Sequence, residues 1–95
     1  MAQSESPLLK VAYTKDFKRD FDRLHIKQVL SPEFTEVMYC LQRNQPLPPQ
    51  YKDHPLKGDK KEYRDCHIFH DLVLIYKIEN DVLTLIRVNT HSEVF

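Results

Sequence analysis

The sequence has one glycine, no tryptophan, two cysteines and no net charge, and each scarcity limits what the protein can be. A single glycine leaves no glycine-rich loop that could hold a phosphate against backbone amides. Cys40 and Cys66 are too few for a disulfide scaffold, which favours reduced thiols in a cytoplasmic protein. No apolar run approaches the roughly 18 residues of a membrane span, and the first residues lack the pattern of a secretory signal. We therefore expect no membrane association.

The residues that are present suffice for one small hydrophobic core. Ninety-five residues predict a single domain over 1–95, with the polar residues 1–7 as a disordered tail. Hydrophobic residues make up 41% of the chain and include five Tyr and five Phe, which argues against a disordered chain. The charges cancel only in total, because residues 43–64 carry a net charge of +3 while residues 65–95 carry −3. Zero net charge therefore does not exclude a polyanionic ligand.

Hydrophobic spacing predicts two helices in the first half of the chain. Thr14 can cap a helix in which Phe17, Phe21 and Leu24 recur at the spacing of one helical face. Residues 31–33, with the sequence Ser-Pro-Glu, are a strong start for a second helix: a capping hydroxyl, a proline in the first turn and an acid at the positive end of the dipole. A brief connection between two such helices is typical of an antiparallel helical hairpin.

Strands are expected on either side of these helices. A short strand over 8–13 comes first, and an irregular loop over 50–62 leads to strands over 63–68, 72–78 and 82–90. The middle strand of these three is nearly all apolar, as expected of a central strand covered on both faces. The order β-α-α-β-β-β indicates an α+β fold, an antiparallel sheet with both helices packed on one face.

Histidines from separate segments form the main candidate site. His54 lies in the loop, His67 near the end of one predicted strand and His91 at the end of the last, and an antiparallel meander can bring all three to one edge of one sheet face. If residues 68–70 form a three-residue hairpin loop, Asp71 lies across from His67 and would orient its imidazole. A two-residue loop would break that pairing.

Two or three histidines with few carboxylates suit metal-free RNA cleavage. One group removes the proton of the ribose 2′-OH and another protonates the leaving oxygen, and histidine fits both roles because its reference pKa is about 6.5. Arg64 and Arg87 lie on the histidine-bearing strands and Lys52 and Lys57 flank His54, so these four side chains are candidates to hold phosphates.

Other interpretations of these residues stay open at this point. The histidines can be structural or merely exposed, and the arginines can be paired with Asp65 or Glu62. A zinc site is disfavoured, because His67 and His70 are three positions apart in a strand and no pair of cysteines has ligand spacing.

Several motifs together resemble a known family. They are Lys-Asp-His-Pro-Leu over 52–56, Tyr-Arg-Asp-Cys-His over 63–67, Leu-Ile-Tyr-Lys over 74–77, and Thr-His followed by a terminal Phe over 90–95. In combination they are similar to the YafQ branch of the RelE/ParE superfamily, the toxins of bacterial type II toxin–antitoxin pairs. The resemblance implies a twisted antiparallel sheet with an N-terminal helical hairpin. It also implies metal-independent endoribonucleolytic cleavage of mRNA on the ribosome, in the bacterial cytoplasm and without a cofactor.

The resemblance also assigns roles to individual residues. The family's catalytic positions correspond to His54, His67, Asp71, His91 and Phe95. Asp65 matches the family's Arg-Asp pair, where its role is either catalytic or structural. Phe95 would stack on a base or support His91. Among the histidines, His91 or His54 is expected as the base and His67 as the acid.

Partners follow from the same resemblance. It implies a cognate antitoxin that folds around the toxin, the ribosome and mRNA as targets, and contact with operator DNA only through the antitoxin. Because a neutral chain attracts free RNA weakly, we expect cleavage to depend on the ribosome. The alternatives are a ParE-like toxin or binding module without nuclease activity, against which the three histidines argue, and a toxin that has lost its activity.

Overall fold

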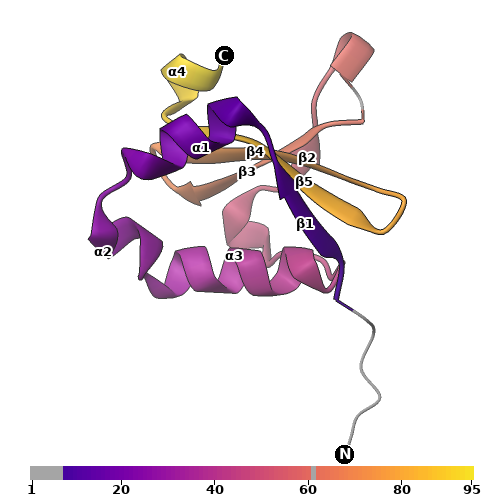
Figure 1. The fold of residues 1–95 in the computed structure, drawn as a ribbon, viewed down its shortest axis with the longest axis horizontal. Coiled ribbons are helices and arrows are strands. Elements are labelled where there is room, and N and C mark those ends of the chain that lie inside the picture. Colours follow the sequence, from indigo (N-terminus) through magenta and orange to yellow (C-terminus); the bar gives the residue numbers. More distant parts are fainter. Residues whose placement is uncertain (1–7, 61) are drawn as a thin grey trace, which may run out of the picture.

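A five-stranded sheet lies at the centre of the computed structural model, which describes residues 8–60 and 62–95 (Figure 1). The tail expected over residues 1–7 lies outside the described residues. The strand order is β1-β5-β4-β3-β2. The strands are β1 (Lys10–Tyr13), β2 (His54–Pro55), β3 (Arg64–Phe69), β4 (Leu72–Glu79) and β5 (Val82–Asn89). Together with the helices they confirm the predicted α+β class.

The sheet is antiparallel, as predicted, except at one edge. The strands β2, β3, β4 and β5 pair antiparallel in succession, whereas β1 joins β5 in parallel with Lys10 opposite Val82. A parallel pair needs a long connection, and the helices and strands between β1 and β5 supply it. The central strand β4 is buried over its first five residues, which matches its apolar sequence.

Four α-helices accompany the sheet, and side chains cap the two longest. The helices are α1 (Lys15–Asp22), α2 (Ile26–Val29), α3 (Pro32–Gln42) and α4 (His91–Val94), and short 3₁₀ turns span Pro49–Tyr51 and Gly58–Lys60. The Thr14 hydroxyl accepts the amide of Phe17 at 2.9 Å at the start of α1. Ser31 accepts the amide of Phe34 at 3.1 Å, which confirms the predicted start of the second long helix. Among the described residues, no helix is both long enough and apolar enough to cross a membrane.

One hydrophobic core joins both long helices to one face of the sheet. Phe17 of α1 and Phe34 of α3 are buried in the same cluster as Cys66, Leu74 and Val88 of the strands. The helix α1 continues along the edge of β5 where β1 ends, because Thr14 bonds to the backbone of Leu85 and Ile86. In Figure 1, α3 and α4 lie on opposite sides of the sheet. The long helix α3 therefore leaves the opposite face of the sheet uncovered, and a functional site can form there next to α4.

The hairpin between β3 and β4 differs from the predicted one. Phe69 pairs with Leu72 and His67 pairs with Val73, so the loop has two residues and Asp71 lies at its tip. The register shifts between His67 and Phe69, and this β-bulge takes up the residue that would have lengthened the loop. The loop is therefore the two-residue alternative, the condition for the pairing is not met, and Asp71 does not lie across from His67.

Candidate active site

A groove of about 600 Å³ lies over the sheet face away from α3. Its walls include His54 of β2, Asp65 of β3, Arg87 of β5, and His91 and Phe95 of the C-terminal segment. Successive residues of a strand point to opposite faces, so Asp65 faces the groove while its neighbour Cys66 enters the core. Elements far apart in sequence thus meet around one cavity.

The two-residue strand β2 places His54 directly opposite Asp65. The loop before it is anchored by Asp53, which accepts hydrogen bonds from Arg64 at 3.2 Å and from the Tyr76 hydroxyl at 2.5 Å. The Nε2 atom of His54 then lies 3.3 Å from Oδ1 of Asp65. Its Nδ1 atom lies 2.7 Å from the carbonyl oxygen of Lys52. A carbonyl can only accept, so Nδ1 carries a proton and the second nitrogen is the one that faces the carboxylate.

Asp65 is buried without full compensation. Its exposed fraction is 3%, and within the described residues Oδ1 has no hydrogen-bond partner. The contact with His54 is within ion-pair distance, although its geometry is not that of a hydrogen bond. Burial raises the pKa of the Asp65 carboxyl, against the opposing effect of His54, His67 and His91. A buried carboxylate with a raised pKa and incomplete hydrogen bonding is typical of a functional site.

Three of the five histidines converge, as the sequence predicted. All three lie close enough to Asp65 to act on its carboxyl, and the ring centroids of His67 and His91 are 6.4 Å apart. The ring of Phe95 lies 4.7 Å from that of His91. Phe95 is exposed, so one edge of the site is an aromatic surface open to solvent.

The C-terminal helix α4 brings these two rings together, and the sequence prediction missed it. His91 was expected at the end of a strand but instead begins this four-residue helix. Thr90 caps the helix by accepting the amide of Glu93 at 3.3 Å. The pattern Thr-x-x-Glu over 90–93 is the signal that could have revealed it. Helical spacing then places Phe95 one turn after His91.

The four predicted phosphate-binding cations lie in three places. Arg87 and Lys57 line the groove. Lys52 borders a separate small depression that includes His67. Arg64 is bound to Asp53 on the opposite side of the sheet, so it does not lie beside the histidines, and phosphate binding by Arg64 stays a prediction. The reason is local: Arg64 adjoins Asp65 in a strand, and neighbours in a strand face opposite ways.

Asp71 lies outside the groove. It is exposed at the hairpin tip, next to Lys27 and Ser31 at the junction of α2 and α3. Its catalytic role thus remains an implication of the resemblance. Within residues 8–60 and 62–95, no three His, Cys, Asp or Glu side chains are placed to hold a metal ion.

The sequence prediction also missed Asp20, which is 2% exposed and binds Arg87. Asp20 lies three residues after Phe17 and one before Phe21, on the apolar stripe of α1. A charged residue on such a stripe is expected to have a buried partner, and this was the available signal.

Comparisons with known proteins identify the family of the chain. Residues 9–95 match the family described as the bacterial toxin of type II toxin–antitoxin systems, YafQ. A toxin YafQ of Haemophilus influenzae is 42% identical over 97 residues, which cover 95% of each chain. An mRNA interferase toxin YafQ of Escherichia coli is 35% identical over 86 residues, covering 90% of this chain and 94% of that protein.

Solved structures give the same result. The crystal structure of a copper-bound mutant toxin from Helicobacter pylori matches with a TM-score of 0.84 at 41% identity, covering 93% of this chain and all of that one. YafQ in the E. coli DinJ–YafQ toxin–antitoxin complex matches with a TM-score of 0.78 at 36% identity, covering 93% and 98%. Sequence and fold therefore agree over nearly the whole chain, which belongs to the YafQ family of bacterial toxins of type II toxin–antitoxin systems.

Proposed function

We propose that the protein is the toxin of such a pair and that it cleaves translated mRNA by metal-independent acid–base catalysis. The observation that carries the proposal is the convergence of His54, His67 and His91 around buried Asp65, beside a groove that His54, His91 and Arg87 line. The E. coli relative named an mRNA interferase supports the reaction class.

His91 is the favoured general base. Both ring nitrogens of His54 face protein acceptors, the Lys52 carbonyl and Asp65, which leaves its ring without a nitrogen directed at a substrate. His91 is exposed in the groove, and its ring makes no hydrogen bond within the described residues. In this scheme His91 removes the 2′-OH proton and His67 protonates the leaving 5′ oxygen. His54 and Asp65 lie beside these two histidines, and the contact between them orients the His54 ring.

Arg87 and Phe95 would hold the RNA around the bond that is cut. Two nitrogens of Arg87 are bonded to Asp20, and Nη1 has no bonded acceptor in the described part of the chain. That nitrogen and Lys57 can stabilise the negative charge that develops on the phosphate. Exposed Phe95 offers a ring on which an unstacked base can lie.

Two partners belong to the proposal. The ribosome would present the message, because a chain without net charge attracts free RNA only weakly. A cognate antitoxin would neutralise the toxin in the cytoplasm and connect it to operator DNA, by analogy with the complex of E. coli YafQ and DinJ.

Primer extension on a reporter mRNA in a reconstituted translation system tests the activity. We expect new 5′ ends within the translated region, and little cleavage of the same RNA without ribosomes. A toxin treated with EDTA and then transferred to the magnesium-containing translation mixture should cleave as well as the untreated toxin. His91→Gln should lower the single-turnover rate roughly 10²–10⁴-fold, because one proton transfer is lost. His70→Gln is the matched control, since His70 is an exposed histidine at the hairpin tip.

Three outcomes would overturn parts of this proposal. Full activity of the His54, His67 and His91 variants would exclude the histidine mechanism. If the toxin treated with EDTA is inactive in the magnesium-containing translation mixture and regains activity with an added transition metal, metal independence is excluded. Intact mRNA together with DNA supercoiling defects would favour the ParE-like alternative.

A further inference from the structure

Asp20 of α1 binds the end of β5 with an unusual number of contacts. Its carboxylate accepts hydrogen bonds from Arg87 Nε at 2.6 Å, and from Arg87 Nη2, the Val88 amide and the Asn89 side chain at 3.2 Å each. The side chain is 2% exposed, and three consecutive residues of β5 converge on it. A buried carboxylate with four donors is fully satisfied and rigidly held.

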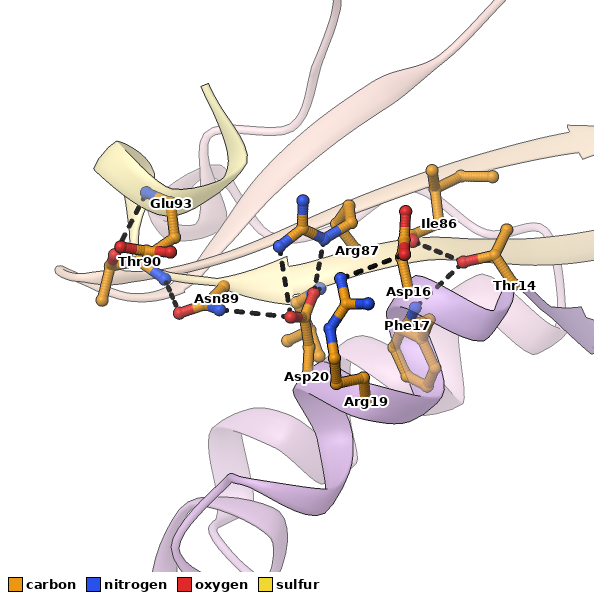
Figure 2. A network of polar contacts seen from close by, with 11 residues as sticks. Thr14, Asp16, Phe17, Arg19, Asp20, Ile86, Arg87, Asn89, Thr90 and Glu93 are labelled. Carbon is orange, nitrogen blue, oxygen red and sulfur yellow. Dashed lines mark hydrogen bonds and ion pairs between the residues drawn. The ribbon is translucent and has the colours of Figure 1, made fainter.

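The same network continues to the start of α4 (Figure 2). Asn89 donates to Asp20 with its amide nitrogen, and its amide oxygen accepts the backbone N–H of Thr90 at 2.8 Å. Thr90 in turn caps α4 through the amide of Glu93. Asp20 is thereby connected, through two side chains, to the helix whose first residue is His91.

We infer that Asp20 is a positioning residue of the groove: it orients the Arg87 guanidinium and fixes the start of the helix that carries His91 and Phe95. The inference rests on the proposed function and extends it to a residue outside the groove. The inference is based on two sets of contacts of the Asp20 carboxylate. One is with Arg87, and the other is with Asn89, which in turn accepts the backbone N–H of Thr90.

The Arg87 branch sets the direction of a cation. A guanidinium is planar, so two bonds to one carboxylate fix the direction of the third nitrogen. Figure 2 shows that Nη1 turns away from Asp20. Since Arg87 also lines the groove, Asp20 holds this donor ready before any RNA binds. Such pre-organisation is the usual source of electrostatic catalysis.

The contacts of Asn89 matter because α4 has only four residues and is not stable as a helix by itself. A four-residue helix has no independent stability in water, and its side chains are largely exposed. Its position therefore depends on the cap at Thr90 and on the residue that bonds Thr90. A shift of the helix would move both rings of the site, and a displacement of about 1 Å can cost roughly 10²-fold in rate.

Asp20 itself does not exchange protons in this scheme. Burial alone would raise the pKa of its carboxyl, but the hydrogen bonds from Arg87, Val88 and Asn89 outweigh burial and lower it. The carboxylate stays ionised throughout the working range, which separates a positioning role from that of an acid or base.

Asp20→Asn tests the inference, with Asp22→Asn as the matched control on the same helix. Asparagine offers one acceptor oxygen to four donors and turns an NH₂ group toward them. In single-turnover cleavage on programmed ribosomes, we expect Asp20→Asn to lower the maximal rate roughly 10- to 100-fold, with a smaller change in the concentration for half-maximal rate. Asp22→Asn, an exposed partner of Lys18, should cleave like the unmodified chain.

Nuclear magnetic resonance of the purified full chain supplies a readout independent of activity. In Asp20→Asn we expect the Arg87 Nε–H signal to lose its downfield shift and the ring signals of His91 and Phe95 to move toward unstructured values. In Asn89→Ala, which leaves the bonds between Asp20 and Arg87 intact, only the His91 and Phe95 signals should move, and the cleavage rate should fall.

The outcomes separate this inference from the proposed function. If Asp20→Asn folds, cleaves at the unmodified rate and keeps these signals, the inference is wrong. If Asp20→Asn does not fold, Asn89→Ala decides, because that residue is partly exposed and carries no buried charge. If the unmodified chain cleaves no mRNA, the proposed function fails, while the resonance shifts still decide whether Asp20 positions Arg87 and α4.

Discussion

Asp20 and Asp65 are the two buried charged side chains among the described residues, and their surroundings are opposite. Asp20 accepts four hydrogen bonds and forms an ion pair with Arg87, and the pKa of its carboxyl is lowered. Asp65 has one oxygen without a hydrogen bond, and burial raises the pKa of its carboxyl. Nearly equal burial, 2% and 3% exposed, thus produces opposite electrostatic states.

The difference shows what each carboxylate does for the protein. A buried charge that is fully paired holds elements together, and removing it leaves its partner uncompensated. A buried charge that is incompletely paired destabilises the fold and persists where its chemistry is needed. Asp20 therefore stabilises the contact between α1 and β5 beside the groove. Burial of the Asp65 carboxylate near three histidines instead destabilises the folded protein.

The largest expected effect is on stability. Asp20→Ala should lower the free energy of unfolding by about 3 kcal/mol, because it leaves the half-buried Arg87 guanidinium and two further donors without their acceptor. Urea unfolding at neutral pH, monitored by circular dichroism, measures this. A loss below about 1 kcal/mol would mean that water replaces the carboxylate and that the network is not a structural anchor.

Asp65→Asn should act in the opposite direction on stability while impairing catalysis. An amide lacks the charge that burial disfavours, so the free energy of unfolding should rise by about 1 kcal/mol. The cleavage rate should fall about 10²-fold, because His54 loses the carboxylate that faces it. Urea unfolding and primer extension on the same preparation test both effects. A destabilised Asp65→Asn variant would show that the carboxylate is paired in solution.

The pH dependence of stability should distinguish the two residues further. The lowered pKa of Asp20 gives stability above the ordinary aspartate pKa of about 3.9, and this stability is lost as the pH falls through the folded-state value. The raised pKa of Asp65 has the reverse sign, since stability is lost as the pH rises from about 3.9 through its folded-state value.

Unfolding measured at several pH values checks these signs. The destabilisation caused by Asp20→Asn should shrink toward acid pH, and the stabilisation caused by Asp65→Asn should vanish there. Parallel curves for the unmodified chain and either variant would contradict the corresponding shift.

Sequence patterns identified the features that depend on neighbouring residues. The cap at Ser31 and the apolar run of β4 are local, and both elements formed as predicted. The convergence of three histidines also followed from local rules, because alternation in strands and the order of a meander fix which side chains share a face. The same alternation would have excluded Arg64 from the histidine face.

The features that were missed depend on distant residues or on very short elements. The strand β2 has two residues and α4 has four, too few for hydrophobic spacing to be visible. The place of Asp71 was decided by a β-bulge, which forms only when β3 meets β4. Asp20 and Arg87 are 67 positions apart in the chain, so the residues near Asp20 in the sequence could not predict Arg87 as its partner.

The smallest expected effect isolates burial as the cause of the contrast. Lys18 and Asp22 on α1 approach to 2.6 Å, the same distance as Arg87 and Asp20, but both side chains of the first pair are more than half exposed. Asp22→Ala should therefore lower the free energy of unfolding far less than Asp20→Ala does, because water solvates the freed ammonium. The same urea experiment measures it, and 0.5 M salt should remove the difference, since exposed pairs are screened. A loss as large as that of Asp20→Ala would show that distance, rather than burial and the number of donors, determines what these carboxylates contribute.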